Sequence, residues 1–147
     1  MVQIRRAEAG DETSLAYIQT ESWKAAFDGI ISAERLAEST KMEHAVGMYH
    51  RRLAAHKGNG YILELDGKPH CIAWWDATRE KDMPGTAELI CIHSLRDNWH
   101  KGYGSRMMER VLADAKSAGY ARIMLWVVDR NVRAIRFYEA HGFAASG

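Results

Sequence analysis

The residues with the clearest chemical potential lie in a short segment that contains two glycines, Asn98-Trp99-His100-Lys101-Gly102-Tyr103-Gly104-Ser105. We predict that this segment joins a strand to a helix. The first amides of a helix have no partners inside it, and the helix dipole adds positive charge there. Glycines at such a junction let a phosphate approach the backbone closely. The segment therefore indicates an anion-binding loop, although two glycines also suit an ordinary tight turn.

Two common phosphate-binding loops do not fit this segment. A Walker loop needs the spacing Gly-x-x-x-x-Gly-Lys-[Ser/Thr], which is missing. A Rossmann fingerprint needs a third glycine and a βαβ unit at the start of the chain. With these two loop types excluded, we predict a diphosphate-binding loop of another kind.

A second informative segment follows at 125–143. With the glycine loop, it resembles the GNAT superfamily of acyl-coenzyme A N-acyltransferases. In that superfamily a Gly-x-Gly loop holds the coenzyme A pyrophosphate, and an Asn-x-x-Ala-x-x-Phe-Tyr-x-x-x-Gly-Phe segment flanks the thiol end. The residues that match at full spacing are Asn131, Ala134, Phe137, Tyr138, Gly142 and Phe143. Upstream, 88–94 resembles the strand before the loop, and 22–30 resembles a helix end found in one bacterial branch.

The resemblance implies acetyl-coenzyme A as cosubstrate, and we expect no metal because the seven histidines form no recognisable metal cluster. The pantetheine of the coenzyme would lie as a pseudo-strand between the strand at 92–94 and the one at 126–128, and amides near 92–94 would polarise the acetyl carbonyl. The chain departs from the family at Trp99 and His100, which stand where Gln or Arg and glycine are usual. The cofactor-binding residues that the resemblance implies are Ile92, His93, Ser94, His100, Lys101, Gly102, Tyr103, Gly104, Ser105, Asn131, Ala134 and Phe137.

Catalysis of amine acetylation requires a neutral amine, a polarised carbonyl and a proton for the departing thiolate. Tyr138 is the candidate acid, because a phenol with a pKa of about 10 is still protonated at neutral pH. Glu88 is the candidate base, acting through water. The alternatives are a core tyrosine and a solvated glutamate. His93 faces the acceptor or is simply packed, and Asn131 also fits the N-cap of a helix.

Trp23 and Phe27 are the candidate substrate-binding residues. They are four residues apart on a predicted helix and so share one face. Core packing is the alternative for both. The expected acceptor is the primary amine of a small molecule or peptide, attacked directly in a ternary complex. A non-catalytic module that binds acyl-coenzyme A and regulates a partner is the second hypothesis, which the presence of Tyr138 and Glu88 disfavours.

These residues need a scaffold, and the hydrophobic periodicity predicts one α/β fold with a mixed sheet and helices on both faces. The expected order is β-α-α-β-β-β-α-β-α-β, with the last strand, at Gly142-Phe143, truncated. A helix is expected near Ser32–His56 with a break near Ser39-Thr40, and a hairpin turns at Asp66-Gly67. The apolar run Ile123–Val128 predicts a central strand covered on both faces.

Length and composition limit the classes of function. The 147 residues suit a single GNAT domain over 1–147, and the net charge of +1 argues against a nucleic-acid partner. No apolar run is long enough to span a membrane, so cytoplasm is the expected location. Cys71 and Cys91 read as buried thiols without metal-site spacing. The short C-terminus after Phe143 leaves an expected strand edge that either the partner chain of a homodimer or another segment would cover.

Overall fold

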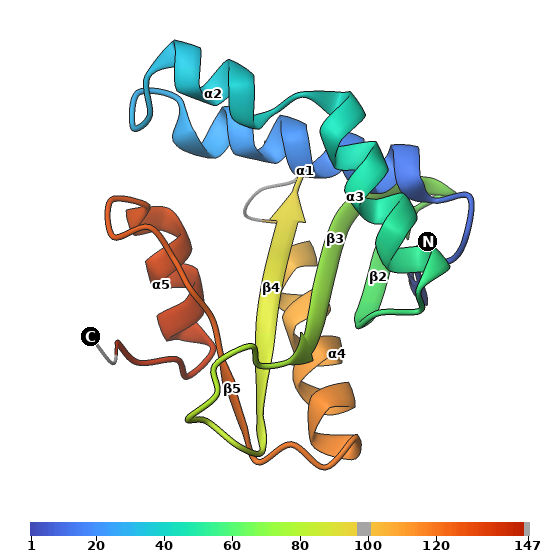
Figure 1. Ribbon diagram of the computed structural model, residues 1–147, viewed down its shortest axis with the longest axis vertical. Helices are drawn as coiled ribbons and strands as arrows, with labels where there is room; N and C mark the ends of the chain where they lie inside the picture. Colours follow the sequence, from blue (N-terminus) through green and yellow to red (C-terminus); the bar gives the residue numbers. More distant parts are fainter. Residues whose placement is uncertain (97–100, 146–147) are drawn as a thin grey trace.

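The computed structural model describes residues 1–96 and 101–145, and it contains one mixed five-stranded sheet with helices on both faces (Figure 1). The sheet order is β1-β2-β3-β4-β5, antiparallel except for the parallel pair β4–β5. The elements are β1 (Val2–Arg6), α1 (Glu12–Phe27), α2 (Ala33–Ser39), α3 (Met42–Ala54), β2 (Asn59–Leu65), β3 (Lys68–Ala77), β4 (Thr86–Ser94), α4 (Tyr103–Ser117), β5 (Arg122–Met124) and α5 (Val132–Ala140). The predicted mixed α/β class is confirmed.

The predicted hairpin between β2 and β3 is present, and its turn residues explain it. Asp66 and Gly67 both have positive φ, at 50° and 84°. Two consecutive positive φ values match the twist of a two-residue hairpin. The predicted break in the second helical stretch is also present, since α2 and α3 are separate helices on either side of Thr40. The Thr40 hydroxyl donates to the carbonyl oxygen of Leu36 at 2.7 Å, where α2 ends.

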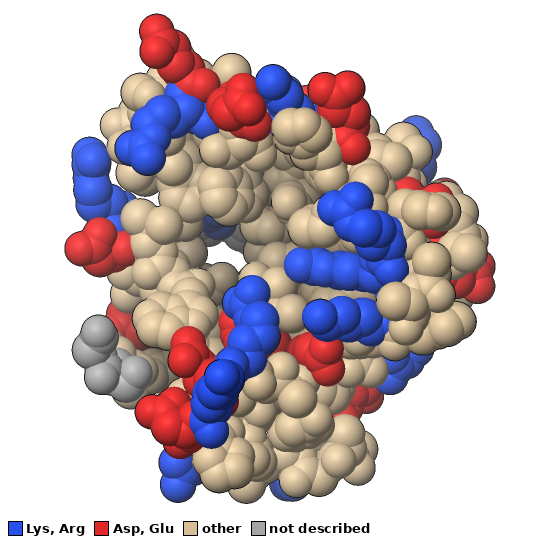
Figure 2. Space-filling view, in the orientation of Figure 1, with Lys and Arg blue, Asp and Glu red and all other residues tan. Residues whose placement is uncertain are grey.

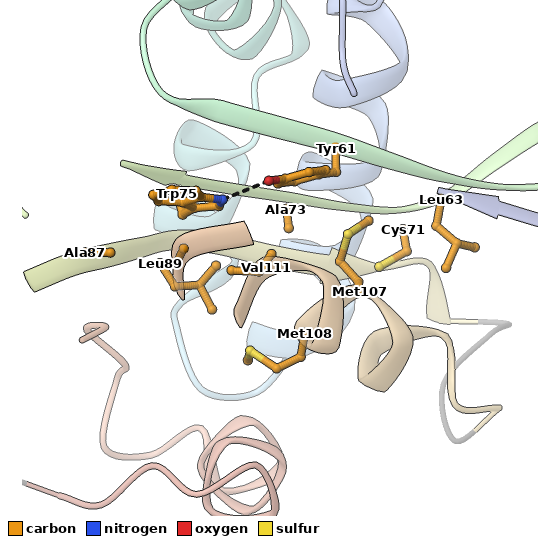
Figure 3. Close-up of a cluster of buried hydrophobic side chains, with 11 residues drawn as sticks. Tyr61, Leu63, Cys71, Ala73, Trp75, Ala87, Leu89, Met107, Met108 and Val111 are labelled. Atoms are coloured by element: carbon orange, nitrogen blue, oxygen red, sulfur yellow. Dashed lines mark hydrogen bonds between the residues drawn. The ribbon is translucent and has the colours of Figure 1, made fainter. Parts of the chain in front are cut away.

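Two hydrophobic clusters hold the layers together, one on each face of the sheet. On one face α4 packs Met107, Met108 and Val111 against the strands, as Figure 3 shows. In this cluster the Trp75 indole N–H donates to the Tyr61 hydroxyl at 3.0 Å. On the other face α1 and α3 pack over Trp74, which belongs to the second cluster. The adjacent tryptophans thus point to opposite faces, as strand alternation requires.

Two predictions at the end of the chain are wrong. β5 ends at Met124 and is an edge strand, whereas we expected a central strand reaching Val128. Trp126 is 68% exposed, so this apolar run is not covered on both faces. Within the described residues Gly142-Phe143 is not a strand, and the order therefore ends with α5. An apolar run predicts a strand from composition alone, but a strand also needs a neighbour for its ladder.

Candidate active site

The candidate site lies where β4 and β5 separate. The two strands pair only between Thr86–Glu88 and Arg122–Met124. Beyond this point 125–128 runs apart from β4, and a cavity of about 260 Å³ lies against β4 residues Ile90 to His93 and against 126–128. In Figure 1 this is the region between β4 and α5, below α1. The separation exposes one side of the β4 backbone to a ligand.

A β-bulge shapes the β4 wall of this cavity. The register places Trp74 opposite Cys91 but Trp75 opposite Leu89, so Ile90 is an extra residue in β4. Bulges bend a strand and re-aim its side chains, often beside active sites. Ile90 and Cys91 both line the cavity, with the predicted residues Ile92 and His93 after them. Sequence reasoning missed Ile90 and Cys91, because an extra residue leaves no trace in an apolar run.

Helix α1 supplies another wall of the cavity. Trp23 and Phe27 line the cavity, with their ring centroids 4.8 Å apart. The hydroxyl of Ser22 donates to the carbonyl oxygen of Ser94 at 2.9 Å, which fixes α1 to the end of β4. Both predicted substrate-binding residues thus stand at the cavity. Figure 2 shows the corresponding hollow between α5 and the sheet, mostly tan inside, with Lys and Arg gathered on the side over β3 and α3.

Tyr138 enters the cavity from α5. Ala134, one turn earlier in α5, and Asn131, just before the helix, also line the cavity. The Asn131 side chain accepts from the Ala134 amide at 3.3 Å, so its predicted N-cap role is confirmed. Burial raises the pKa of Tyr138 to about 12; the neighbouring Cys91 adds to the shift, and the charge of Arg133 opposes it. The phenol is therefore protonated at neutral pH and available as a donor.

His93 also lines the cavity and carries no charge at neutral pH. Burial lowers the pKa of its imidazole to about 4, and the charge of Arg133 acts in the same direction. An imidazole in this state accepts or donates a hydrogen bond but is a weak base. It shares the lining of the cavity with Trp23 and Tyr138.

Glu88, the predicted base, does not line the cavity. Its carboxylate is 2% exposed and forms an ion pair with the guanidinium of Arg79. It also accepts from the Arg79 backbone N–H at 3.2 Å and from the Thr78 hydroxyl at 3.3 Å. The Arg79 hydrogen bond lowers the pKa of Glu88 against the effect of burial. The geometry gives Glu88 a structural role, holding the residues after β3 against β4.

We therefore expect Glu88→Gln to lower stability and to spare catalysis. The free energy of unfolding should fall by about 1–2 kcal/mol, because a buried charge-assisted hydrogen bond is weakened while exposed Arg79 is left in water. Since the folded pKa of Glu88 is depressed, this stability is present above the unfolded pKa and is lost as pH falls through the folded one. Denaturant melts at pH 7 and pH 3 test both points. A kcat reduced a hundredfold would instead restore Glu88 as the base.

The described part of the glycine loop leads directly into α4. Gly102 precedes the helix with φ of 83° and, as a glycine, has no side chain with which to cap the helix N-terminus. A Cβ on Gly104 would lie 3.3 Å from the Phe137 ring, so glycine here allows α4 and α5 to approach closely. Ser105 Oγ and His141 Nε2 are 3.1 Å apart, which joins the same two helices.

The remaining predicted cofactor-binding residues are spread around this junction. Lys101 is exposed beside Gly102, and Tyr103 begins α4 with its ring packed against the α4 face of the sheet. His100 lies outside the described residues. A second hollow, of about 640 Å³, is lined by α2, 28–33 and Arg130, and it contains none of the predicted site residues.

Two further findings concern metals and membranes. Among the described residues no group of three or more His, Cys, Asp or Glu is placed to hold a metal ion. No helix within 1–96 or 101–145 has the length and apolar character needed to cross a membrane. Cys71 and Cys91 are free thiols, the former fully buried.

Comparisons with known proteins agree with this geometry. An uncharacterized N-acetyltransferase of Bacillus subtilis, YuaI, is 23% identical over 141 residues, covering 96% of this chain and 79% of YuaI. Among solved structures, the PaiA N-acetyltransferase of Thermoplasma acidophilum in complex with coenzyme A has a TM-score of 0.83 at 21% identity, covering 99% of this chain and 91% of that one. The aminoglycoside N-acetyltransferase AAC(6')-Iy in complex with coenzyme A has a TM-score of 0.77 at 14% identity, covering 100% and 90%.

At these identities the structural likeness establishes the fold, and the sequence itself establishes the family. The match to the Acetyltransferase (GNAT) family runs over residues 20–143, which includes Trp23, Phe27 and the whole of α5. The chain belongs to the GNAT acetyltransferase family.

Proposed function

We propose that this protein transfers an acetyl group from acetyl-coenzyme A to a primary amine by direct attack within a ternary complex. The observation that carries the proposal is the cavity between β4 and 125–128, which has Tyr138 on one wall and Trp23 and Phe27 on another. Coenzyme A in two of the similar structures supports the choice of cosubstrate. We also propose that residues 1–147 form a single GNAT domain.

The residues around the cavity suit the parts of the coenzyme. The amides at the start of α4, after Gly102, would bind the diphosphate, helped by the exposed charge of Lys101. The β4 edge at Ile90 to His93 and the segment 126–128 would hold the pantetheine between them. When bound, the coenzyme supplies an acetyl group activated as a thioester.

Tyr138 is the proposed general acid. Its phenol stays protonated because burial raises its pKa, and it lies in the cavity where the thiolate would leave. None of the described cavity-lining residues is acidic, whereas Arg52 is cationic. A low-dielectric site with a nearby cation disfavours an ammonium and favours the neutral amine. We propose that this environment, rather than a dedicated carboxylate base, delivers a nucleophilic amine.

A thiol-release assay tests the proposal. Acetyl-coenzyme A is incubated with the protein and a panel of amino acids, polyamines, aminoglycosides and peptide N-termini, and free coenzyme A is measured together with acetylated amine by mass spectrometry. The proposal requires amine-dependent release with an equal yield of acetylated product. Tight coenzyme binding without turnover over the whole panel would contradict it and would support a non-catalytic acyl-coenzyme A-binding module.

The pH profile is a further expected result. Because the pKa of Tyr138 is raised to about 12, this acid stays protonated, and kcat should not decline on its account below about pH 10. His93, with a pKa of about 4, should contribute no inflection above pH 6. kcat/KM should rise with pH as the acceptor loses its proton. Steady-state rates from pH 6 to pH 10, with circular dichroism as the folding control, measure this. An alkaline decline centred near pH 8.5 would contradict it.

A further inference from the structure

The charges around the cavity suggest what kind of amine it accepts. Arg52, on α3, is one of the cavity-lining residues. The charge of Arg133, on α5, contributes to the lowered pKa of His93. The described residues that line the cavity include no Asp or Glu. A polyamine or aminoglycoside carries further positive charges beyond the reacting amine, and these would meet repulsion without any compensating carboxylate.

Arg52 is held in place by aromatic rings rather than by an acid. The central carbon of its guanidinium lies 5.5 Å from the ring centroids of both Tyr49 and Trp74. Tyr49 is itself fixed, because it is fully buried and its hydroxyl donates to the Gln19 side chain. None of the seven ion pairs found within the described residues includes Arg52. Stacking positions a guanidinium and leaves its N–H edge for a planar anion.

The charge of Arg52 acts inside the cavity. Burial raises the pKa of Cys91, on the β4 wall, and the Arg52 charge opposes that shift. The same charge opposes the raised pKa of Tyr49. The cavity lining also includes the apolar side chains of Trp23, Phe27 and Met48. The cavity thus combines one cationic position with an apolar wall.

We propose that the acceptor is a small amino carboxylate with an apolar or aromatic body, and that Arg52 binds its carboxylate. The body would pack against Trp23 and Phe27, while the amine points to the β4 side of the cavity. Guanidinium and carboxylate form charge-assisted, often bidentate hydrogen bonds. This inference rests on the proposed function and narrows it to one class of acceptor.

Matched acceptor pairs test the inference. Leucine, methionine and phenylalanine are each compared with the decarboxylated amine of the same body, and spermidine serves as the polycation. Rates are corrected for the fraction of neutral amine. With the unaltered protein, kcat/KM for at least one amino acid should exceed that of its decarboxylated partner at least tenfold. In Arg52→Gln this advantage should vanish, mainly through a KM raised about 10- to 100-fold, and Arg52→Lys should retain part of it.

The controls separate folding from recognition. Arg51→Gln removes the same charge from the neighbouring exposed position, which does not line the cavity, and should change neither member of a pair. Because the charge of Arg52 also favours the neutral amine of both members of a pair, the readout for Arg52→Gln is the ratio of the two kcat/KM values within each pair, and the melting temperature of the variant reports folding. Equal losses for both members of each pair, or a preference for spermidine, would overturn the inference while leaving acetyl transfer intact. Absence of turnover with every amine would overturn the proposed function as well.

Discussion

Replacing Tyr138 by phenylalanine is expected to lower kcat about a hundredfold, because a positioned general acid contributes on the order of 10²–10⁴ to a proton transfer. The substitution keeps the ring, and with it the contacts to Phe137 and Phe143 at centroid distances of 5.6 and 5.9 Å. The hydroxyl is the group that we expect to protonate the thiolate. The affinity for coenzyme A should therefore change less than threefold. Single-turnover rates and isothermal titration of coenzyme A measure the two quantities.

Tyr120→Phe is the matched control for this prediction. Tyr120 packs its ring edge-on against Trp75, 5.7 Å away between centroids, and it does not line the cavity. Loss of its hydroxyl should leave kcat unchanged. If Tyr138→Phe retains full kcat while Tyr120→Phe does as well, the acid is another group or water. If Tyr138→Phe instead loses coenzyme affinity, the ring contributes to binding and not to proton transfer.

Ser105→Asp is expected to weaken coenzyme A binding about 30-fold without lowering stability. Ser105 stands in the first turn of α4, and an acidic residue in a first turn usually stabilises the helix. The same carboxylate would repel a diphosphate bound at these amides. The effect on the dissociation constant should shrink as salt is raised from 0.05 to 0.5 M, since exposed charges are screened. Titration calorimetry and thermal melting measure the two opposite responses.

Two controls distinguish charge from contact. Ser105→Ala removes the hydroxyl that lies 3.1 Å from His141 but adds no charge, and it should weaken binding only slightly. Ala113→Asp places the same charge on an exposed position two turns further along α4 and should have little effect. Coenzyme affinity that is insensitive to Ser105→Asp would move the diphosphate away from the start of α4.

The sequence predicted those features that local chemistry determines. Asn131 caps α5 because its short polar side chain can accept a hydrogen bond from a free backbone N–H in the first turn of the helix. Asp66-Gly67 turns because both residues tolerate positive φ. Tyr138, Trp23 and Phe27 reach one cavity because each sits at a fixed spacing within a helix that the resemblance located.

Features that depend on tertiary packing could not be predicted. Ile123–Val128 reads as a central strand, yet the ladder with β4 ends after three pairs, and nothing in the apolar run marks that point. The sequence offers Glu88 as a candidate base, but it gives no sign that Arg79, nine residues earlier, forms an ion pair with the Glu88 carboxylate. Arg52 lies in a helix that the sequence predicts, but only the fold places its guanidinium over Tyr49 and Trp74.

The parting of β4 and β5 has a consequence for the protein before it meets any ligand. Trp126, Val127 and Val128 are 68%, 37% and 44% exposed along this opening, next to β4 residues without a β5 partner. Such an apolar margin invites self-association during refolding or storage. A coenzyme bound along this margin would cover the exposed apolar side chains. The cosubstrate would then also protect the chain against self-association.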